Sequence, residues 1–71
     1  MNYEIGKTYE ISHSRKGKMT VAITALNDEW VECLIVDGYA KALKGGAVAV
    51  EGEPLTFRAS LATIIREIEA A

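Results

Sequence analysis

The first half of this chain alternates apolar and polar residues in short segments that end at turn residues, and no other feature limits the possible folds as strongly. Three such segments follow one another, at residues 8–13, 18–26 and 30–36. In the first segment, Tyr9 and Ile11 share one face. Period-two alternation bounded by Gly, Asn and Asp is typical of half-buried antiparallel strands. The pattern therefore predicts a mostly β architecture, and it indicates no particular chemistry.

Length and composition limit the size and class of the protein. With 71 residues, of which 49% are hydrophobic, the chain is expected to form a single small domain, residues 1–71, with little core to spare. No apolar run approaches the ~20 residues that span a bilayer, and the first residues lack the pattern of a signal peptide. Cys33 is the single cysteine, which excludes an internal disulfide framework. Together these features predict a cytoplasmic location.

Charge is distributed unevenly along the chain. The net charge is −2, which argues weakly against indiscriminate binding to nucleic acid. Even so, Arg15, Lys16 and Lys18 lie close together and closely follow His13, in a turn where Gly17 is able to take a positive φ. This basic loop is either a solvated hairpin tip, as charged turns usually are, or a contact surface for an anionic partner.

The middle of the chain fits no single pattern. Residues 39–44 include good helix formers, and Gly45 would end a short helix there. The same residues could instead extend the third strand past a bulge at Gly38. We interpret residues 38–53 as a long, mobile connection that contributes little to the core.

The last third of the chain has two interpretations. Leu55 and Phe57 alternate with polar residues, which predicts a fourth strand. Residues 60–71 read as a helix, because their apolar residues fall at i, i+3, i+4 and i+7. They also read as a 3₁₀ turn over residues 60–63 followed by a short fifth strand over residues 64–69, and their β-branched residues weaken the helix.

The order of these elements resembles that of an SH3-like barrel. Residues 17–23, a glycine followed by alternating residues, are similar to a strand of KOW-type barrels, although KOW proteins usually have a more basic surface. Residues 57–61 resemble the junction between a strand and a 3₁₀ turn in such barrels. With residues 5–11 leading into residues 13–17, the whole chain resembles small uncharacterised proteins of bacteriophages and prophages.

The resemblance covers residues 5–69 and implies a fold but no functional residue. The implied fold is a single SH3-like barrel of about five antiparallel strands with a 3₁₀ turn near residues 60–63. The alternative is a β-sheet with a C-terminal helix over residues 60–71.

Residues able to support catalysis or to bind a metal are scarce. One His and one Cys, twenty residues apart, do not make a metal site. His13 and Ser14 are neighbours, but adjacent residues of a strand point to opposite faces, so they do not form a catalytic pair. We therefore expect no enzyme, no catalytic or metal-binding residue, no cofactor and no small-molecule substrate.

Aromatic residues and cations supply the remaining candidates for binding. Trp30 either covers one end of the barrel or offers a stacking platform, and Tyr39 is a candidate for an exposed contact. Phe57 and Tyr9 are expected in the core, and so is Cys33. The candidate contact residues for a partner or a nucleic acid are His13, Arg15, Lys16, Lys18, Trp30, Tyr39 and Arg58.

Two functional hypotheses follow. The first is a protein-interaction or assembly module, such as a phage-type accessory protein, that binds a protein partner or a second copy through an apolar face containing Leu34 and Val36. The second is a small barrel that binds nucleic acid through the basic loop, residues 13–18, with Lys41 and Arg58 as possible neighbours. Neither hypothesis involves a membrane.

Overall fold

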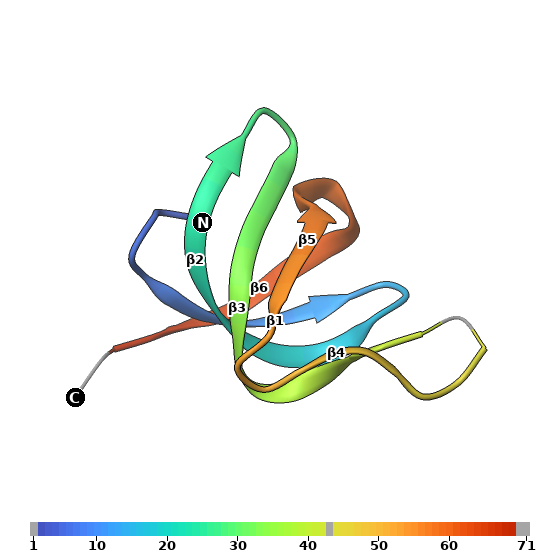
Figure 1. Ribbon diagram of the computed structural model, residues 1–71. Coiled ribbons are helices and arrows are strands. Elements are labelled where there is room, and N and C mark those ends of the chain that lie inside the picture. Colours follow the sequence, from blue (N-terminus) through green and yellow to red (C-terminus); the bar gives the residue numbers. More distant parts are fainter. Residues whose placement is uncertain (1, 43, 70–71) are drawn as a thin grey trace.

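The computed structural model describes residues 2–42 and 44–69, and antiparallel strands make up most of them (Figure 1). The elements are β1 Thr8–His13, β2 Gly17–Asn27, β3 Trp30–Lys41, β4 Ala47–Val50, β5 Pro54–Arg58, a 3₁₀ turn η1 at Ala59–Leu61, and β6 Ala62–Ile68. The described residues contain no α-helix, and so no helix that is long and apolar enough to cross a membrane. The prediction of a mostly β fold is confirmed.

The strands form one open sheet around two long central members. The order is β4-β3-β2-β1-β6, and β5 pairs with β3 on the same edge as β4. The first half of β3 pairs with β5 and its last residues pair with β4. Both β2 and β3 curve strongly along their length, so each contributes to two layers that cross over the core (Figure 1). Within the described residues no pairing joins β6 to β4 or β5, so the sheet does not close.

The two predicted turns of the first half lie where the sequence indicates. β1 ends at His13 and β2 begins at Gly17, whose φ is +85°. The next turn follows Asn27, and there Asp28 adopts a φ of +53°. Asp tolerates this left-handed conformation better than most residues. Both hairpins are therefore fixed by local turn chemistry.

Alternation places one face of each strand in the core. The buried apolar residues are Tyr9, Ile11, Met19, Val21, Ile23, Val31, Cys33, Ile35, Ala40, Ala49, Leu55 and Phe57. The predictions that Tyr9, Cys33 and Phe57 lie in the core are confirmed. Tyr3 packs edge-on against the rings of Tyr9 and Phe57, with centroids 5.5 and 5.9 Å away. This aromatic group fills the space between the layers.

The interpretation of residues 38–53 as a mobile connection outside the core is wrong. β3 continues through Gly38, whose φ is +85°, and a third hairpin returns the chain as β4. The bulge in β3 lies just before Gly38, where the register shifts between Ile35 and Asp37. Ala40 and Ala49 face each other across this hairpin and are both buried. The alternative of a short helix ending at Gly45 is also wrong for the described residues, while Leu43 lies outside them. This hairpin brings the number of strands to six.

The C-terminal segment is a strand rather than a helix. β6 pairs with β1 along its length, from Thr8 opposite Ile68 to His13 opposite Ala62. The β-branched residues of this segment fit a pleated sheet well. The 3₁₀ turn precedes β6 at residues 59–61, slightly earlier than predicted. Of the alternative helix over residues 60–71, residues 70 and 71 lie outside the described part.

Two substitutions within β4 test whether this hairpin belongs to the core. Ala49→Asp places a carboxylate in the buried interior and should lower the free energy of unfolding by about 3 kcal/mol or more. Ala47→Asp, at an exposed position of the same strand, should change it by less than about 1 kcal/mol. Urea denaturation of the two variants measures the difference. Equal losses would contradict the packing described for Ala49.

Candidate functional site

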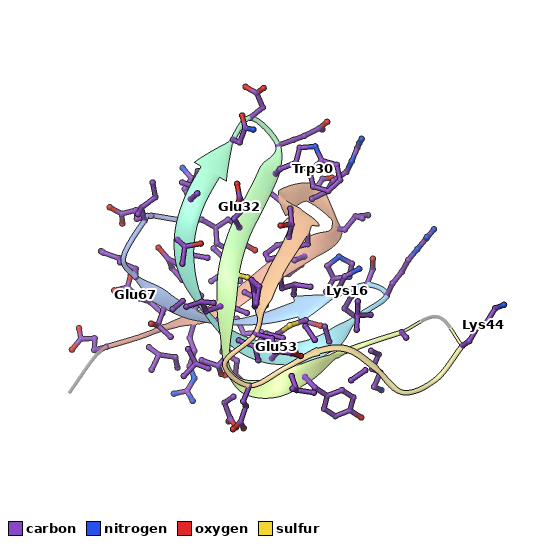
Figure 2. The ribbon with its side chains drawn as sticks, viewed as in Figure 1. Lys16, Trp30, Glu32, Lys44, Glu53 and Glu67 are labelled. Carbon is purple, nitrogen blue, oxygen red and sulfur yellow. The ribbon has the colours of Figure 1, made fainter. Side chains whose placement is uncertain are left out.

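The β1–β2 turn carries the predicted basic loop. Arg15 and Lys18 are exposed, and Lys16 is half-buried. Figure 2 shows the Lys16 side chain beside this turn, near the end of β1. Ser14 N–H donates to the carbonyl oxygen of Leu61 at 2.9 Å, which fixes the base of the turn to η1.

His13 supports this loop from the inside. Its side chain is buried, and its ring lies edge-on to Phe57 with centroids 5.8 Å apart. Its Nδ1 accepts hydrogen bonds from the backbone N–H groups of Arg15, at 3.0 Å, and Lys16, at 3.1 Å. His13 is a candidate contact residue from the sequence, and the structure places it beneath the loop surface. Its hydrogen bonds hold the turn in shape.

Burial lowers the pKa of His13 below its usual value of 6.5, and the nearby charges of Lys16 and Arg15 lower it further. The hydrogen bonds agree with this direction. A protonated Nδ1 has no lone pair to accept the two N–H groups of the turn. The loop is therefore built around a neutral imidazole.

The end of β3 lies against the basic loop. Lys41 N–H donates to the carbonyl oxygen of Lys16 at 3.0 Å. The side chain of Lys41 runs alongside Gly17, where a Cβ would lie 3.6 Å from the Lys41 Cδ and Cε atoms. The sequence-based expectation that Lys41 neighbours the loop is confirmed. We call the group Arg15, Lys16, Lys18 and Lys41 the basic tip.

No residue of the basic tip forms an ion pair with any other residue in the described part of the chain, and the same holds for Lys44 further along the β3–β4 loop. The three remaining cations all have carboxylate partners. Lys7 Nζ lies 3.1 Å from Glu4 and 3.6 Å from Glu67, and Arg66 Nε lies 2.8 Å from Glu10. The third pair joins Arg58 Nη1 and Glu29 at 3.5 Å. Unpaired positive charge is therefore gathered at the hairpin tips.

Two predicted contact residues lie apart from the basic tip. Arg58 is opposite Trp30 in the β3–β5 pairing, and its guanidinium carbon lies 5.1 Å from the centroid of the Trp30 ring. This pair sits beside the β2–β3 turn, where Arg58 also meets Glu29. The sequence-based expectation that Arg58 neighbours the basic loop finds no support in these contacts. Trp30 is 40% exposed, with the cation above part of its ring.

A second surface, which the sequence indicates only in part, follows the outer sides of β3 and β4. Its exposed apolar residues are Leu34, Val36, Tyr39, Val48 and Val50, here called the outer strip. Tyr39 is directly opposite Val50, and both line a shallow hollow of about 580 Å³. Leu34 and Val36, which the first functional hypothesis places on an apolar binding face, are both exposed. In β4, the larger Val48 and Val50 alternate with the smaller Ala47 and Ala49. This alternation is the sequence pattern from which β4 could have been predicted.

The groups that resemble reactive residues are held in unreactive settings. Burial raises the pKa of the Cys33 thiol to about 11, and its Sγ lies 3.4 Å from the carbonyl oxygen of Leu55. At neutral pH this thiol is protonated, and the thiolate is the reactive form. Across residues 2–42 and 44–69, no three His, Cys, Asp or Glu side chains gather in a way that could hold a metal ion.

No protein-family model, curated protein or solved structure matches this chain. Its function is therefore inferred from the basic tip and the outer strip.

The role of His13 predicts a pH dependence of stability. Because its pKa is lower in the folded state than the ~6.5 of an unfolded chain, the unfolded state binds more protons. The free energy of unfolding should therefore fall as the pH drops below about 7, through the interval between the two pKa values. Urea denaturation at several pH values above the carboxylate range measures this.

The matched control is His13→Asn, which keeps a side-chain acceptor for the turn and does not titrate. Its stability should be nearly independent of pH over the same interval. The same pH slope in both proteins would show that His13 is not the group responsible.

Proposed function

We propose that this chain is a non-enzymatic interaction module with the architecture of a small SH3-like barrel. The strand order, the strong curvature of β2 and β3, and the 3₁₀ turn before the last strand support this assignment of fold. The resemblance of the sequence to small phage and prophage proteins supports the role of an accessory protein. The settings of His13 and Cys33 support a role without catalysis, and the buried free thiol suits the reducing cytoplasm.

The observation that carries the proposed function is the exposure of the outer strip. Tyr39, Val48 and Val50 are each 45% exposed or more, and they lie together on one short hairpin. A solvent-facing group of apolar side chains in a protein with so small a core is typical of an interaction surface. Tyr is also among the residues that contribute most to binding at interfaces.

A second copy of the chain is the occupant that the charges of this hairpin favour. Lys44 lies in the loop before β4, whereas Glu51 and Glu53 follow its end (Figure 2). A two-fold axis across the strip would run the two β4 strands in opposite directions and bring the basic end of each hairpin near the acidic end of the other. Such self-complementarity is what a symmetric dimer requires.

Contact through side chains fits this hairpin better than the addition of a strand. Val50 N–H already donates to Glu53 Oε1 at 2.8 Å. A carboxylate that occupies a backbone donor in this way blunts the edge of a sheet. The apolar side chains above the hairpin remain free to pack against their counterparts.

The test is light scattering combined with size-exclusion chromatography, and sedimentation equilibrium for the dissociation constant. The native chain should form a dimer, and Tyr39→Ser should weaken it by about tenfold or more because it removes an aromatic side chain from the contact. Ile65→Ser is the matched control, since Ile65 has a similar exposure (43% against 47%) on the distant strand β6. It should leave the dimer unchanged.

A charge exchange tests the proposed orientation. Lys44→Glu and Glu51→Lys should each weaken the dimer by roughly twofold, and the double variant should recover most of the loss. A chain that stays monomeric at millimolar concentration would overturn the self-association. Equal effects of Tyr39→Ser and Ile65→Ser would overturn the role of the outer strip.

A further inference from the structure

The basic tip concentrates positive charge in a protein whose net charge is −2. Its four cations come from two separate hairpins, and the hydrogen bond from Lys41 N–H to the Lys16 oxygen holds these hairpins together. Like charges so close together repel one another, and within the described residues no carboxylate is paired with them. An anionic ligand would relieve this repulsion.

Side chains, rather than backbone groups, are the available donors at this site. The N–H groups of Arg15 and Lys16 are occupied by His13 Nδ1. The charges are spread over the β1–β2 turn, the start of β2 and the end of β3. A single bound phosphate ion needs convergent donors, whereas a chain of phosphates can meet cations one after another.

The residues around the basic tip favour a nucleic acid over an acidic protein as its ligand. Its sequence neighbours Met19 and Ala40 are buried, and the exposed Leu61 and Tyr39 lie at its margins, at the base of the turn and two positions before Lys41. Protein interfaces depend on apolar and aromatic anchors at their centre, whereas the four members of the tip are all cations. Binding to a phosphate backbone requires little more than positive charge. Three of the four cations are lysines, which act as point charges and do not favour a particular base.

We propose that the basic tip binds the phosphate backbone of a nucleic acid without reading its sequence. The basic tip shares no residue with the outer strip, although Lys41 follows Tyr39 by two positions on β3. The proposal therefore rests on different side chains from those proposed for self-association.

Fluorescence anisotropy with a labelled oligothymidylate and with a mixed-sequence duplex tests the proposal. If all four cations meet phosphates, raising the salt from about 50 to 200 mM should weaken binding about 50-fold for the single strand and about 150-fold for the duplex. For Arg15→Ala/Lys16→Ala the single-strand factor should drop to about 7-fold, because half of the contacts are lost. The affinity of this variant at low salt should fall by tenfold or more.

The matched control is Lys7→Ala/Arg66→Ala, which changes the net charge by the same amount but removes cations that are paired with carboxylates. It should bind within about twofold of the native chain at equal salt, since these cations contribute little to a remote phosphate contact. Equal losses in the two double variants would show a general charge effect and overturn the site.

Two further readouts separate this proposal from its competitors. Tyr39→Ser should keep the affinity per protomer for the oligonucleotide, even where it disrupts the dimer. A polyglutamate peptide should compete only weakly. Competition equal to that of an oligonucleotide of the same charge would reassign the tip to acidic proteins, and no binding at low salt would exclude nucleic acid altogether.

Discussion

A β-bulge in β3, where the register shifts between Ile35 and Asp37, is the constraint on which both candidate surfaces depend. Before the bulge, the buried residues of β3 are the odd-numbered Val31, Cys33 and Ile35. After the bulge, the buried residue is the even-numbered Ala40. Strict alternation would have turned Tyr39 and Lys41 inward. Gly38 follows this bulge with a φ of +85°, which favours glycine, while the space is adequate, since a Cβ would lie 3.5 Å from the nearest atoms. The extra residue of the bulge, Val36, therefore turns an aromatic and a cation outward and brings a small alanine into the core.

The same change of period explains what could and could not be predicted from the sequence. Buried and more exposed residues alternate through β1, most of β2 and the first half of β3. The buried faces of these strands and the turns between them could therefore be predicted from the sequence. The strands within residues 38–50 could not be predicted, because the bulge at Val36 breaks the period-two signal just before them. Ala, Gly and Lys are also common there, and these residues have little preference for strands. The buried alanines stabilise the hairpin through close packing that no residue-by-residue propensity reports.

The basic tip could be predicted only in part, because its members come from segments that are distant in the sequence. Three cations of the basic tip are close in sequence, so the loop was visible at once. Its fourth member, Lys41, is a neighbour only because β3 passes the bulge and reaches Lys16. Arg58 does not belong to the basic tip, because the register of β5 places it opposite Trp30. Strand register depends on long-range pairing, which a single sequence does not specify.

The ion pairs divide the cations into those that connect elements of the fold and those of the basic tip, which do not. Arg66 and Lys7 tie β6 to β1 and the N-terminal segment through Glu10 and Glu67. The basic tip has no such partners in the described chain, and surfaces that serve solubility alone mix both signs. Local arrangements that oppose stability without a compensating contact are expected where a chain performs its function. The neutral His13 also indicates that this turn serves a function. The fold uses a buried polar group to hold the turn in shape, although the charges of the turn form no ion pair with the described residues.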